Sequence, residues 1–409
     1  MMKKNIFYVL YTTFNLDVFF RTIIESVFLT TVKGLTPSDI ILITFIGIGA
    51  SICLSPIILI ASKKMGNKKS LIIGSFCSVL CVIFYMICNQ LIGFIFASIF
   101  YNLIALFYQP ADIMLKNNLK SLNNEEDFVK WKTYGKLGFS VATLIVSLIS
   151  GFCFNINHYL PIWLSLTCAI LGLIFAFLFQ DTNVENSKDL EHLEQEKSSF
   201  KNIFCNKIMV LILLMNIFGI GVITFYQART SLLIQLSCNN FALDLAKISI
   251  IISFVDFGSR IIKILSNFIL PHTYKRIDDK SMLINYVGIV ILVASLLLSI
   301  GGILHISVTL SICLITLGFF MLISIRDVYD TLESKIIITK IPERQQKQAV
   351  ILYGVYKKVG RLITNLLALI LLKFFTLNCV YCLLLPLIFI HIFICFKLSK
   401  LIKNVRQDF

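Results

Sequence analysis

Apolar residues dominate this chain in twelve long stretches, and short polar connections separate them. A hydrocarbon core about 30 Å thick needs about 20 mostly apolar residues when a helix crosses it. Because unpaired backbone N–H and C=O groups are not tolerated in lipid, we expect each stretch to be an α-helix. The twelve predicted membrane spans are residues 5–31, 39–62, 70–89, 91–115, 133–155, 159–180, 207–234, 245–269, 282–302, 306–331, 348–373 and 378–399.

The basic residues of the connections give these spans an orientation. If Lys3 and Lys4 lie in the cytoplasm and the sides alternate, nearly all the connecting Lys and Arg are cytoplasmic. The outer connections then hold only Lys33 and Lys373. An excess of Lys and Arg on the cytoplasmic side is typical of membrane proteins. We therefore expect an all-α, multi-pass protein of the plasma (inner) membrane with both termini in the cytoplasm.

One long polar interval, residues 181–206, interrupts the series between the sixth and seventh spans. It is rich in Asp, Glu and Lys, which is typical of a solvated linker, although its 191–197 part could form a short surface helix. The interval predicts two six-helix bundles. They comprise residues 1–180 and 207–409, and a cytoplasmic linker over residues 181–206 joins them.

The composition supports a membrane protein and argues against a nucleic-acid binder. The chain is 57% hydrophobic and 14% charged, which leaves too little polar surface for a water-soluble protein of 409 residues. The net charge of +15 could indicate nucleic acid, but no aromatic–basic binding module occurs. Basic loops beside anionic lipid account for the charge. We expect a monomer whose partners are membrane lipid, a small-molecule substrate and protons, with no nucleic acid.

No pattern in the sequence indicates an enzyme. The twelve cysteines are scattered, most of them inside spans, and the five histidines lack metal-ligand spacing, so we expect no cofactor, metal or disulfide framework. A Walker-type phosphate loop, an HExxH motif and a Ser-His-Asp arrangement are all missing from the sequence. If the protein does energetic work, the energy must come from an ion gradient or from substrate flow.

The two halves contain similar short segments at equivalent spans. The fifth span begins with Tyr134-Gly-Lys-Leu-Gly138, and Tyr356-Lys-Lys-Val-Gly360 lies in the eleventh span, 222 residues later. Parallel repeats of this kind occur in transporters built from two related bundles. The similarity of these two segments therefore predicts that the two halves share one fold.

The connection between the second and third spans reads Ser62-Lys-Lys-Met-Gly-Asn-Lys-Lys69. It resembles the loop signature of the major facilitator superfamily, and the matching positions are Lys64, Gly66, Lys68 and Lys69. The Asp of that signature falls on Lys63 and its upstream Gly on Leu59. In the family this Asp helps to lock the cytoplasmic gate, so the resemblance implies a different lock here.

The same resemblance implies two six-helix bundles and a secondary transporter. The family's antiporter signature, a Gly-Pro pair in the fifth span, is missing, and Gly138-Phe139-Ser140 stands in its place. That difference weakens a drug–proton antiporter interpretation without excluding it.

Ionisable residues inside the predicted spans are the candidate functional groups, because each costs several kcal/mol in hydrocarbon. The first span carries Asp17, Arg21 and Glu25 at i, i+4 and i+8, on one helix face, with Asn15 close to Asp17 along the chain. We expect this face to line a central cavity and to carry substrate and proton coupling. The alternative is a charge ladder that only fixes helix packing.

The eighth span repeats the pattern with Asp256 and Arg260, which can pair within the helix and point to a structural or gating role. Further cavity or gate candidates lie in the fourth, seventh, tenth and eleventh spans: Gln109, Asp112, Asn216, Gln227, Arg229, Arg326, Asp327, Asp330, Lys358 and Arg361. Lys357, Lys358 and Arg361 form a basic cluster in the eleventh span. It would favour an anionic substrate if it faced the cavity, or lipid phosphate if it faced the bilayer surface.

These patterns predict a secondary active transporter that moves a small organic solute by alternating access. We expect it to export the solute and to be driven by protons. A carboxylate close to a cation changes its proton affinity when the cation moves away, and Arg21 between two carboxylates has that arrangement. Two alternatives stay open. One is uptake of a small anionic metabolite, and the other is a transporter-like receptor or membrane partner that does not transport.

Overall fold

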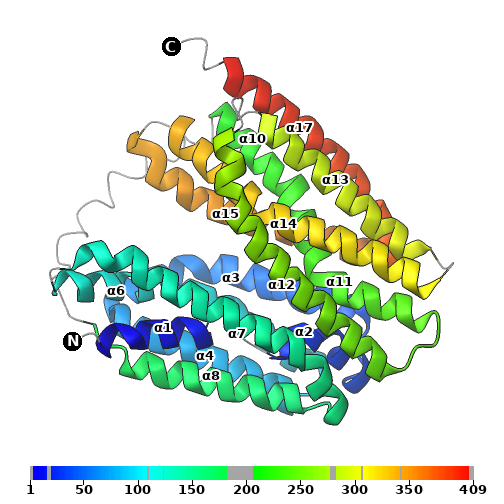
Figure 1. The fold of residues 1–409 in the computed structure, drawn as a ribbon, viewed down its shortest axis with the longest axis horizontal. Helices are drawn as coiled ribbons and strands as arrows, with labels where there is room; N and C mark the ends of the chain where they lie inside the picture. The colour runs from blue at the N-terminus through cyan, green and yellow to red at the C-terminus, as the bar shows by residue number, and fades with distance from the viewer. Residues whose placement is uncertain are drawn as a thin grey trace. The chain divides into compact units, whose positions relative to one another are not determined.

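The computed structural model describes residues 3–15, 20–107, 110–122, 124–181, 206–276, 282–304, 307–340 and 343–404. Every regular element in these ranges is a helix, so the predicted all-α fold is confirmed there (Figure 1). The chain divides into two compact units. The first contains Met1–Asn186 and Asp244–Arg260, and the second contains Ser187–Leu243 and Ile261–Phe409. The predicted linker at 181–206 lies almost wholly outside the described residues.

The helices of the first unit are α1 (Lys3–Asn15), α2 (Phe20–Val27), the π-helical turn η1 (Phe28–Val32), α3 (Pro37–Met65), α4 (Asn67–Ile87), α5 (Leu91–Phe107), α6 (Pro110–Lys120), the 3-10 turn η2 (Glu125–Asp127), α7 (Phe128–Ile156) and α8 (Leu160–Leu178). The helix α12 (Leu245–Arg276) starts in this unit and continues into the second. The predicted division assigned this whole span to the C-terminal half.

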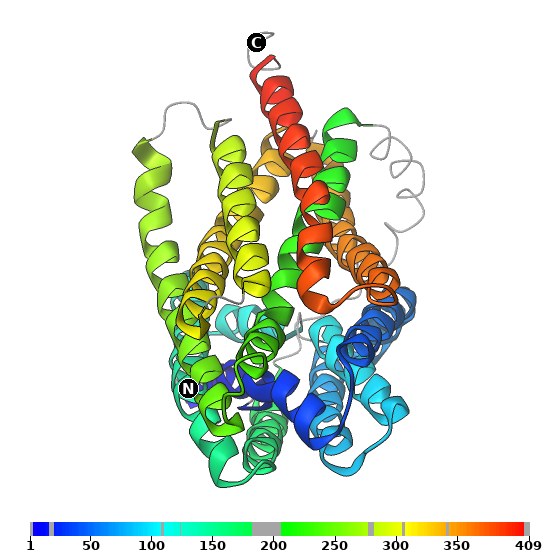
Figure 2. The same ribbon diagram turned by 90° about the vertical axis from the view of Figure 1, so that its right-hand side faces the viewer.

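The other helices of the second unit are α10 (Lys207–Met215), the π-helical turn η4 (Asn216–Ile220), α11 (Gly221–Asn239), α13 (Met282–Ile303), α14 (Val308–Lys340), α15 (Glu343–Leu371), α16 (Leu377–Leu383) and α17 (Leu385–Asn404). The helices α13 and α17 pack side by side, as both ribbon views show (Figures 1 and 2).

Each predicted span coincides with a described helix or a series of helices. Within the described residues, eight segments are long and apolar enough to qualify as membrane spans. Of the other four, the first and fourth predicted spans are interrupted by residues outside the described ranges. The remaining two, on α12 and α15, carry the charged residues noted above. The count of twelve crossing helices and the location of the termini therefore stay predictions.

Local sequence explains how α3 begins and ends. Thr36 and Asp39 form a reciprocal capping box at its start, and Pro37 occupies the first turn, where its missing N–H costs nothing. Gly66 separates α3 from α4 with φ at 81°, a backbone conformation that favours glycine. The positive φ between α3 and α4 therefore explains why a glycine occupies position 66 of the loop signature.

Glycines set the closest helix contacts in both units. In the first, α1 packs on α7, and a Cβ added to Gly138 would overlap the Thr13 hydroxyl. In the second, η4 packs on α15, and a Cβ added to Gly360 would overlap the carbonyl oxygen of Asn216. The last glycine of each repeated segment therefore marks the place where the fifth or eleventh span contacts the first or seventh. This equivalence supports the internal repeat.

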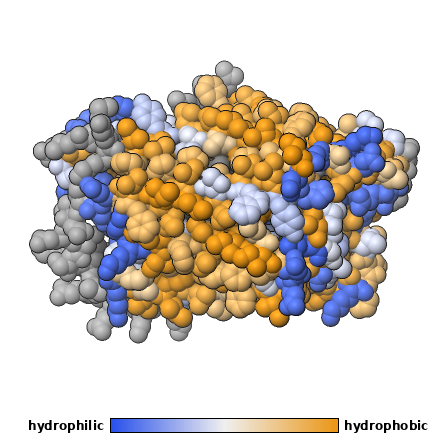
Figure 3. All heavy atoms as spheres, turned by 90° about the horizontal axis from the view of Figure 1, so that it is seen from below, coloured by the Kyte–Doolittle hydropathy of each residue, from blue (hydrophilic) through white to orange (hydrophobic). Residues whose placement is uncertain are grey.

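Large apolar side chains remain exposed along the outward faces of several helices. On α7 they recur at every third or fourth position: Leu137, Val141, Ile145, Ile149, Phe152 and Ile156. Figure 3 shows that apolar residues cover most of one face, and that hydrophilic residues gather toward its two ends. An exposed apolar surface of this extent is typical of contact with lipid.

Candidate functional site

Arg21 is the largest fully buried side chain and lies in the first turn of α2, with 2% of its surface exposed. Its guanidinium group contacts the Glu25 carboxylate, with 3.2 Å between Nη1 and Oε1. The same group lies 4.2 Å from the ring centre of Tyr85 and 5.4 Å from that of Tyr101. A planar guanidinium stacks well on aromatic faces, so two rings and one carboxylate stabilise this buried cation.

Glu25 links the buried Arg21 to a more accessible region, because 34% of its side chain is exposed. The Tyr85 hydroxyl donates a hydrogen bond to the same carboxylate oxygen that Arg21 contacts. The predicted Arg21–Glu25 pair is therefore present. Asp17 lies outside the described residues, and only the backbone of Asn15 is described. The structure thus leaves the full three-residue ladder a prediction.

A second charged cluster of the first unit centres on Asp112 at the start of α6. The Tyr8 hydroxyl of α1 donates to its Oδ1 over 2.8 Å, and Lys132 of α7 lies 2.7 Å from its Oδ2. The lysine and aspartate side chains are 38% and 30% exposed. Gln109, predicted to act beside Asp112, lies outside the described residues.

Asp256 and Arg260 pair within α12, as their spacing predicts, with 3.2 Å between Oδ2 and Nε. Both side chains are partly exposed, at 21% and 30% respectively. A contact within one helix fits the structural role considered for this pair.

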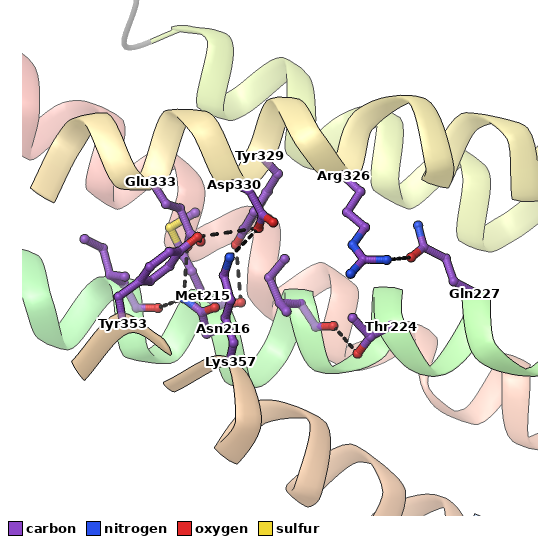
Figure 4. Close-up of polar contacts among 12 residues, drawn as sticks. Met215, Asn216, Thr224, Gln227, Arg326, Tyr329, Asp330, Glu333, Tyr353 and Lys357 are labelled. Atoms are coloured by element: carbon purple, nitrogen blue, oxygen red, sulfur yellow. Dashed lines mark hydrogen bonds and ion pairs between the residues drawn. The ribbon is translucent and has the colours of Figure 1, made fainter. Parts of the chain in front are cut away.

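Among the described carboxylates, that of Glu333 on α14 is the most deeply buried, with 1% of the residue exposed (Figure 4). Each of its oxygens accepts a hydrogen bond. The Asn216 amide donates to Oε1 over 3.1 Å, and the Tyr353 hydroxyl of α15 donates to Oε2 over 2.7 Å. Helices from three of the predicted spans therefore meet at one carboxylate.

A more accessible ion pair lies one turn away. Lys357 contacts Asp330 with 2.8 Å between Nζ and Oδ1, and the two side chains are 26% and 36% exposed. The Lys357 ammonium also lies 4.2 Å from the ring centre of Tyr353. The Tyr353 hydroxyl is 3.5 Å from Asp330 Oδ1, so it stands between the buried and the accessible carboxylate. The side chain of Asp327 is outside the described set.

Asn216 opens the π-helical turn η4 and is completely buried. Its Oδ1 has no hydrogen-bond partner among the residues that the structure describes, while its amide nitrogen also donates to the Ile212 carbonyl. The neighbouring Met215 carbonyl accepts a 3.4 Å bond from the Tyr329 hydroxyl. Single π-helical turns often occur at functional sites.

Gln227 and Arg326, both predicted as cavity or gate residues, connect α11 to α14. The Gln227 side chain donates to the Leu322 carbonyl over 3.0 Å and accepts from Arg326 over 3.2 Å (Figure 4). Arg229 is 8% exposed and lies near the stacked rings of Tyr226 and Tyr381, whose centres are 4.6 Å apart. These contacts join helices but do not by themselves identify a ligand.

On α15, Lys358 and Arg361 are half-buried, whereas the third member of the basic cluster, Lys357, is neutralised by Asp330. In the loop signature, Lys64 and Lys69 are exposed. Lys68 instead caps the end of α8, where its ammonium donates to the carbonyls of Ala176, Phe177 and Phe179. Cations are favourable at helix C-termini, so Lys68 holds the chain where it leaves α8.

Sequence reasoning missed Glu333, Tyr353, Tyr85 and Tyr101. Glu333 lies just beyond the predicted end of the tenth span at residue 331, because α14 continues to Lys340. Its spacing of i+3 from Asp330 and i+7 from Arg326 was a usable signal, since it extends the charged face of that span. The tyrosines gave no signal, because tyrosine is equally typical of membrane interfaces.

A family model for the major facilitator superfamily matches residues 6–364. The chain belongs to the major facilitator superfamily. The predicted family is therefore confirmed, and with it a multi-pass membrane transporter rather than an enzyme. Comparison with curated protein sequences gave no match.

Solved structures with the same fold include transporters for different cargoes. A mutant form of the nucleoside transporter NupG is 13% identical, with a TM-score of 0.77 over 97% of this chain and 100% of that chain. A bacterial homologue of the human lysosomal transporter Spinster, inward-facing and unoccupied, is 13% identical, with a TM-score of 0.61 over 98% and 97%. A bacterial metal transporter is 12% identical, with a TM-score of 0.64 over 97% and 98%. At such identities the similarity shows the fold alone.

Proposed function

We propose that this superfamily member is a proton-coupled secondary transporter that moves a small organic solute by alternating access. The observation that carries the proposal is the Arg21–Glu25 pair, in which a fully buried cation contacts a carboxylate that is about one-third exposed. A buried charge needs a stable partner, whereas an accessible carboxylate can gain a proton. The pair therefore combines both properties that a coupling site needs.

Protonation of Glu25 would remove most of its attraction for Arg21, and the guanidinium would then be held only by the Tyr85 and Tyr101 rings and by its other neighbours. A site whose proton affinity differs between two conformations couples the proton to the conformational change. We propose that the two halves of the chain, residues 1–180 and 207–409, alternate access to a cavity that the first-span residues face.

For the solute we propose a small organic compound, with export as the direction implied by the family resemblance. Nucleosides are a natural first probe because NupG is named as a nucleoside transporter. Uptake of a small anion is the second candidate, and Lys358 and Arg361 favour it. Its support is reduced because Lys357, the third basic residue, is already paired with Asp330.

The proposal includes twelve crossing helices, both termini in the cytoplasm and a monomer in the plasma membrane. It divides the protein into bundles at 1–180 and 207–409. Single cysteines introduced at Lys68, Lys130 and Lys275 should react with membrane-impermeant reagents only from the cytoplasmic side. External labelling at any of them would contradict the orientation.

The direct test uses the purified full chain in liposomes and follows labelled uridine and labelled succinate under pH gradients of either sign. Protein-dependent uridine flux that follows the gradient supports the proposal, and succinate flux supports the anionic alternative. Protein-dependent flux that ignores both gradients would contradict proton coupling. No protein-dependent flux across nucleosides, organic cations and organic anions would favour a non-transporting receptor.

A further inference from the structure

We propose that Asp330, Tyr353 and Glu333 form a proton pathway in the second unit, in which Glu333 is a buried proton-binding site filled from Asp330 through the Tyr353 hydroxyl. The inference rests on the proposed function only for its consequence, that this proton takes part in coupling. It arises from groups that the sequence did not single out as a unit.

The first argument is the burial of Glu333. Its carboxylate accepts hydrogen bonds from the neutral Asn216 amide and Tyr353 hydroxyl, the neutral Tyr329 hydroxyl lies close to it as well, and the nearby Lys357 contacts Asp330. Among the described side chains, no cation forms an ion pair with Glu333; an ionised carboxylate that is buried without such a partner is costly, and a proton removes that cost. A group in this position is suited to bind a proton rather than to hold a permanent charge.

The second argument is the position of the Tyr353 hydroxyl. It lies 2.7 Å from Glu333 Oε2 and 3.5 Å from Asp330 Oδ1, so one rotation changes the carboxylate to which it donates. A hydroxyl can donate one hydrogen bond while it accepts another. Tyr353 is therefore placed to pass a proton between two acids that need not touch.

The transfer balances without any further reactant. A proton that reaches Asp330 displaces Lys357 from Oδ1 and makes a carboxylic acid. The acid O–H donates its proton to the Tyr353 oxygen while the tyrosine proton passes to Glu333 Oε2. Asp330 is then a carboxylate that pairs again with Lys357, Tyr353 is neutral, and Glu333 is a neutral acid whose O–H donates to Tyr353.

The third argument is access. The Asp330 and Lys357 side chains are about one-third and one-quarter exposed, whereas Glu333 is 1% exposed. Other titratable or polar groups close to Glu333 or its partners come from the same helix and from α15, α17 and η4: Tyr329, Asp330, Tyr353, Lys357, His391, Cys395 and Asn216. Among these, the Asp330–Lys357 pair is the one with substantial exposure, so it is the entrance.

Proton binding at Glu333 would be transmitted to the backbone of the seventh span. Asn216 donates to the carboxylate and opens the π-helical turn η4, and its carbonyl lies against Gly360 of α15. Neutral Glu333 is a weaker acceptor for the Asn216 amide. The contact between α14 and η4 is therefore weaker when the proton is bound.

The test needs no substrate. Infrared difference spectra of the full chain in liposomes, recorded as the pH is lowered, should show a protonated carboxyl band that Glu333→Gln removes and Glu25→Gln retains. After a rapid drop in pH, Tyr353→Phe should develop this band at least about tenfold more slowly, because the relay hydroxyl is gone. Tyr226→Phe is the matched control, since its buried hydroxyl donates to the Tyr381 carbonyl and not to a carboxylate.

A full-size band in folded Glu333→Gln would overturn the proton site, and a normal rate in Tyr353→Phe would overturn the pathway. If Glu333→Gln does not fold, Tyr353→Phe and Asp330→Asn still test the pathway, because Asp330→Asn should slow the band as well. The result is separate from the proposed function: a protein that transports nothing can still show the band, and a transporter can lack it.

Discussion

Each unit holds a small cluster that contains a tyrosine, a lysine and one or two acids, but the contacts within the two clusters differ. In the first unit, Tyr8 and Lys132 both contact one half-exposed carboxylate, Asp112. In the second, the lysine contacts Asp330 and the tyrosine donates to Glu333. In the first unit, the single acid Asp112 is therefore paired with the lysine. In the second unit, the lysine pairs with Asp330, and Glu333 has no ion-pair partner among the described side chains.

The two units also differ in the charge of the ionisable group that each buries beside a more exposed partner. The first unit buries a cation, Arg21, against a partly exposed acid, whereas the second buries an acid, Glu333, near a partly exposed cation, Lys357. Each unit thus buries at least one ionisable group and holds a group of opposite charge closer to water, and the second unit also buries Arg229 and His391. The comparison teaches that two units with similar helix contacts can bury ionisable groups of opposite charge.

The largest effect should come from removing the buried cation. Arg21→Ala leaves Glu25 without its ion-pair partner and empties the space between the Tyr85 and Tyr101 rings. Loss of one partner of a buried pair costs about 3–5 kcal/mol, so the variant should melt far below the wild type or fail to accumulate. Thermal melting in detergent measures the difference.

Arg260→Ala is the control, because its pair with Asp256 is partly exposed. It should cost at most about 1 kcal/mol. If Arg21→Ala and Arg260→Ala lower the melting temperature equally, the burial of Arg21 does not add to the stability that its ion pair provides.

The next effect tests the repeated glycines. Gly360→Ala places a methyl group against the Asn216 backbone carbonyl, whereas Gly138→Ala meets the Thr13 hydroxyl, which can rotate away. Overpacking costs about 1–3 kcal/mol, and the larger cost should fall on Gly360→Ala because a backbone carbonyl cannot yield as easily. Melting temperatures of both variants check this order.

Gly354→Ala provides the matched control on α15, since nothing lies within 4 Å of the added group. A helical Gly→Ala change without a clash should be neutral or stabilising. If Gly354→Ala and Gly360→Ala behave alike, the glycine contact is not the basis of the repeat.

The smallest effects should come from the two accessible lysines. Lys132→Ala and Lys357→Ala each remove a partly exposed ion pair, which is worth about 0–1 kcal/mol. We expect Lys357→Ala to cost more, because its ammonium lies 4.2 Å from the Tyr353 ring centre, whereas the Lys132 ammonium is 5.6 Å from the Phe128 ring centre. Chemical denaturation of the two variants in parallel measures this difference, and a larger loss for Lys132→Ala would reverse the comparison.

Contacts within one helix could be predicted from the sequence, and contacts between helices could not. The spacing of Arg21 with Glu25, and of Asp256 with Arg260, was enough to expect both pairs. The contact of Asp112 with Tyr8 and Lys132 depends on which faces of α1, α6 and α7 meet, and spacing along one helix does not fix that.

The ends of the helices limited the prediction in the same way. Hydropathy placed helices at all twelve spans, but polar residues at a span's end resemble a loop. For that reason the predicted tenth span ends at residue 331, before Glu333. In the structure α14 continues for about two more turns, and Glu333 is buried. Burial there is supplied by η4 and α15, which are distant in the sequence.

The most direct test of the account compares two transport assays on Glu25→Gln, which keeps the shape of the side chain but cannot titrate. With a solute that the wild-type chain carries in liposomes, the variant should lose accumulation driven by a pH gradient while one-for-one solute exchange continues. This result is expected because exchange needs the binding site and the rocking motion but no net proton movement. If the variant accumulates solute at the wild-type rate and with the wild-type pH dependence, Glu25 is a packing residue and coupling at the Arg21–Glu25 pair is contradicted.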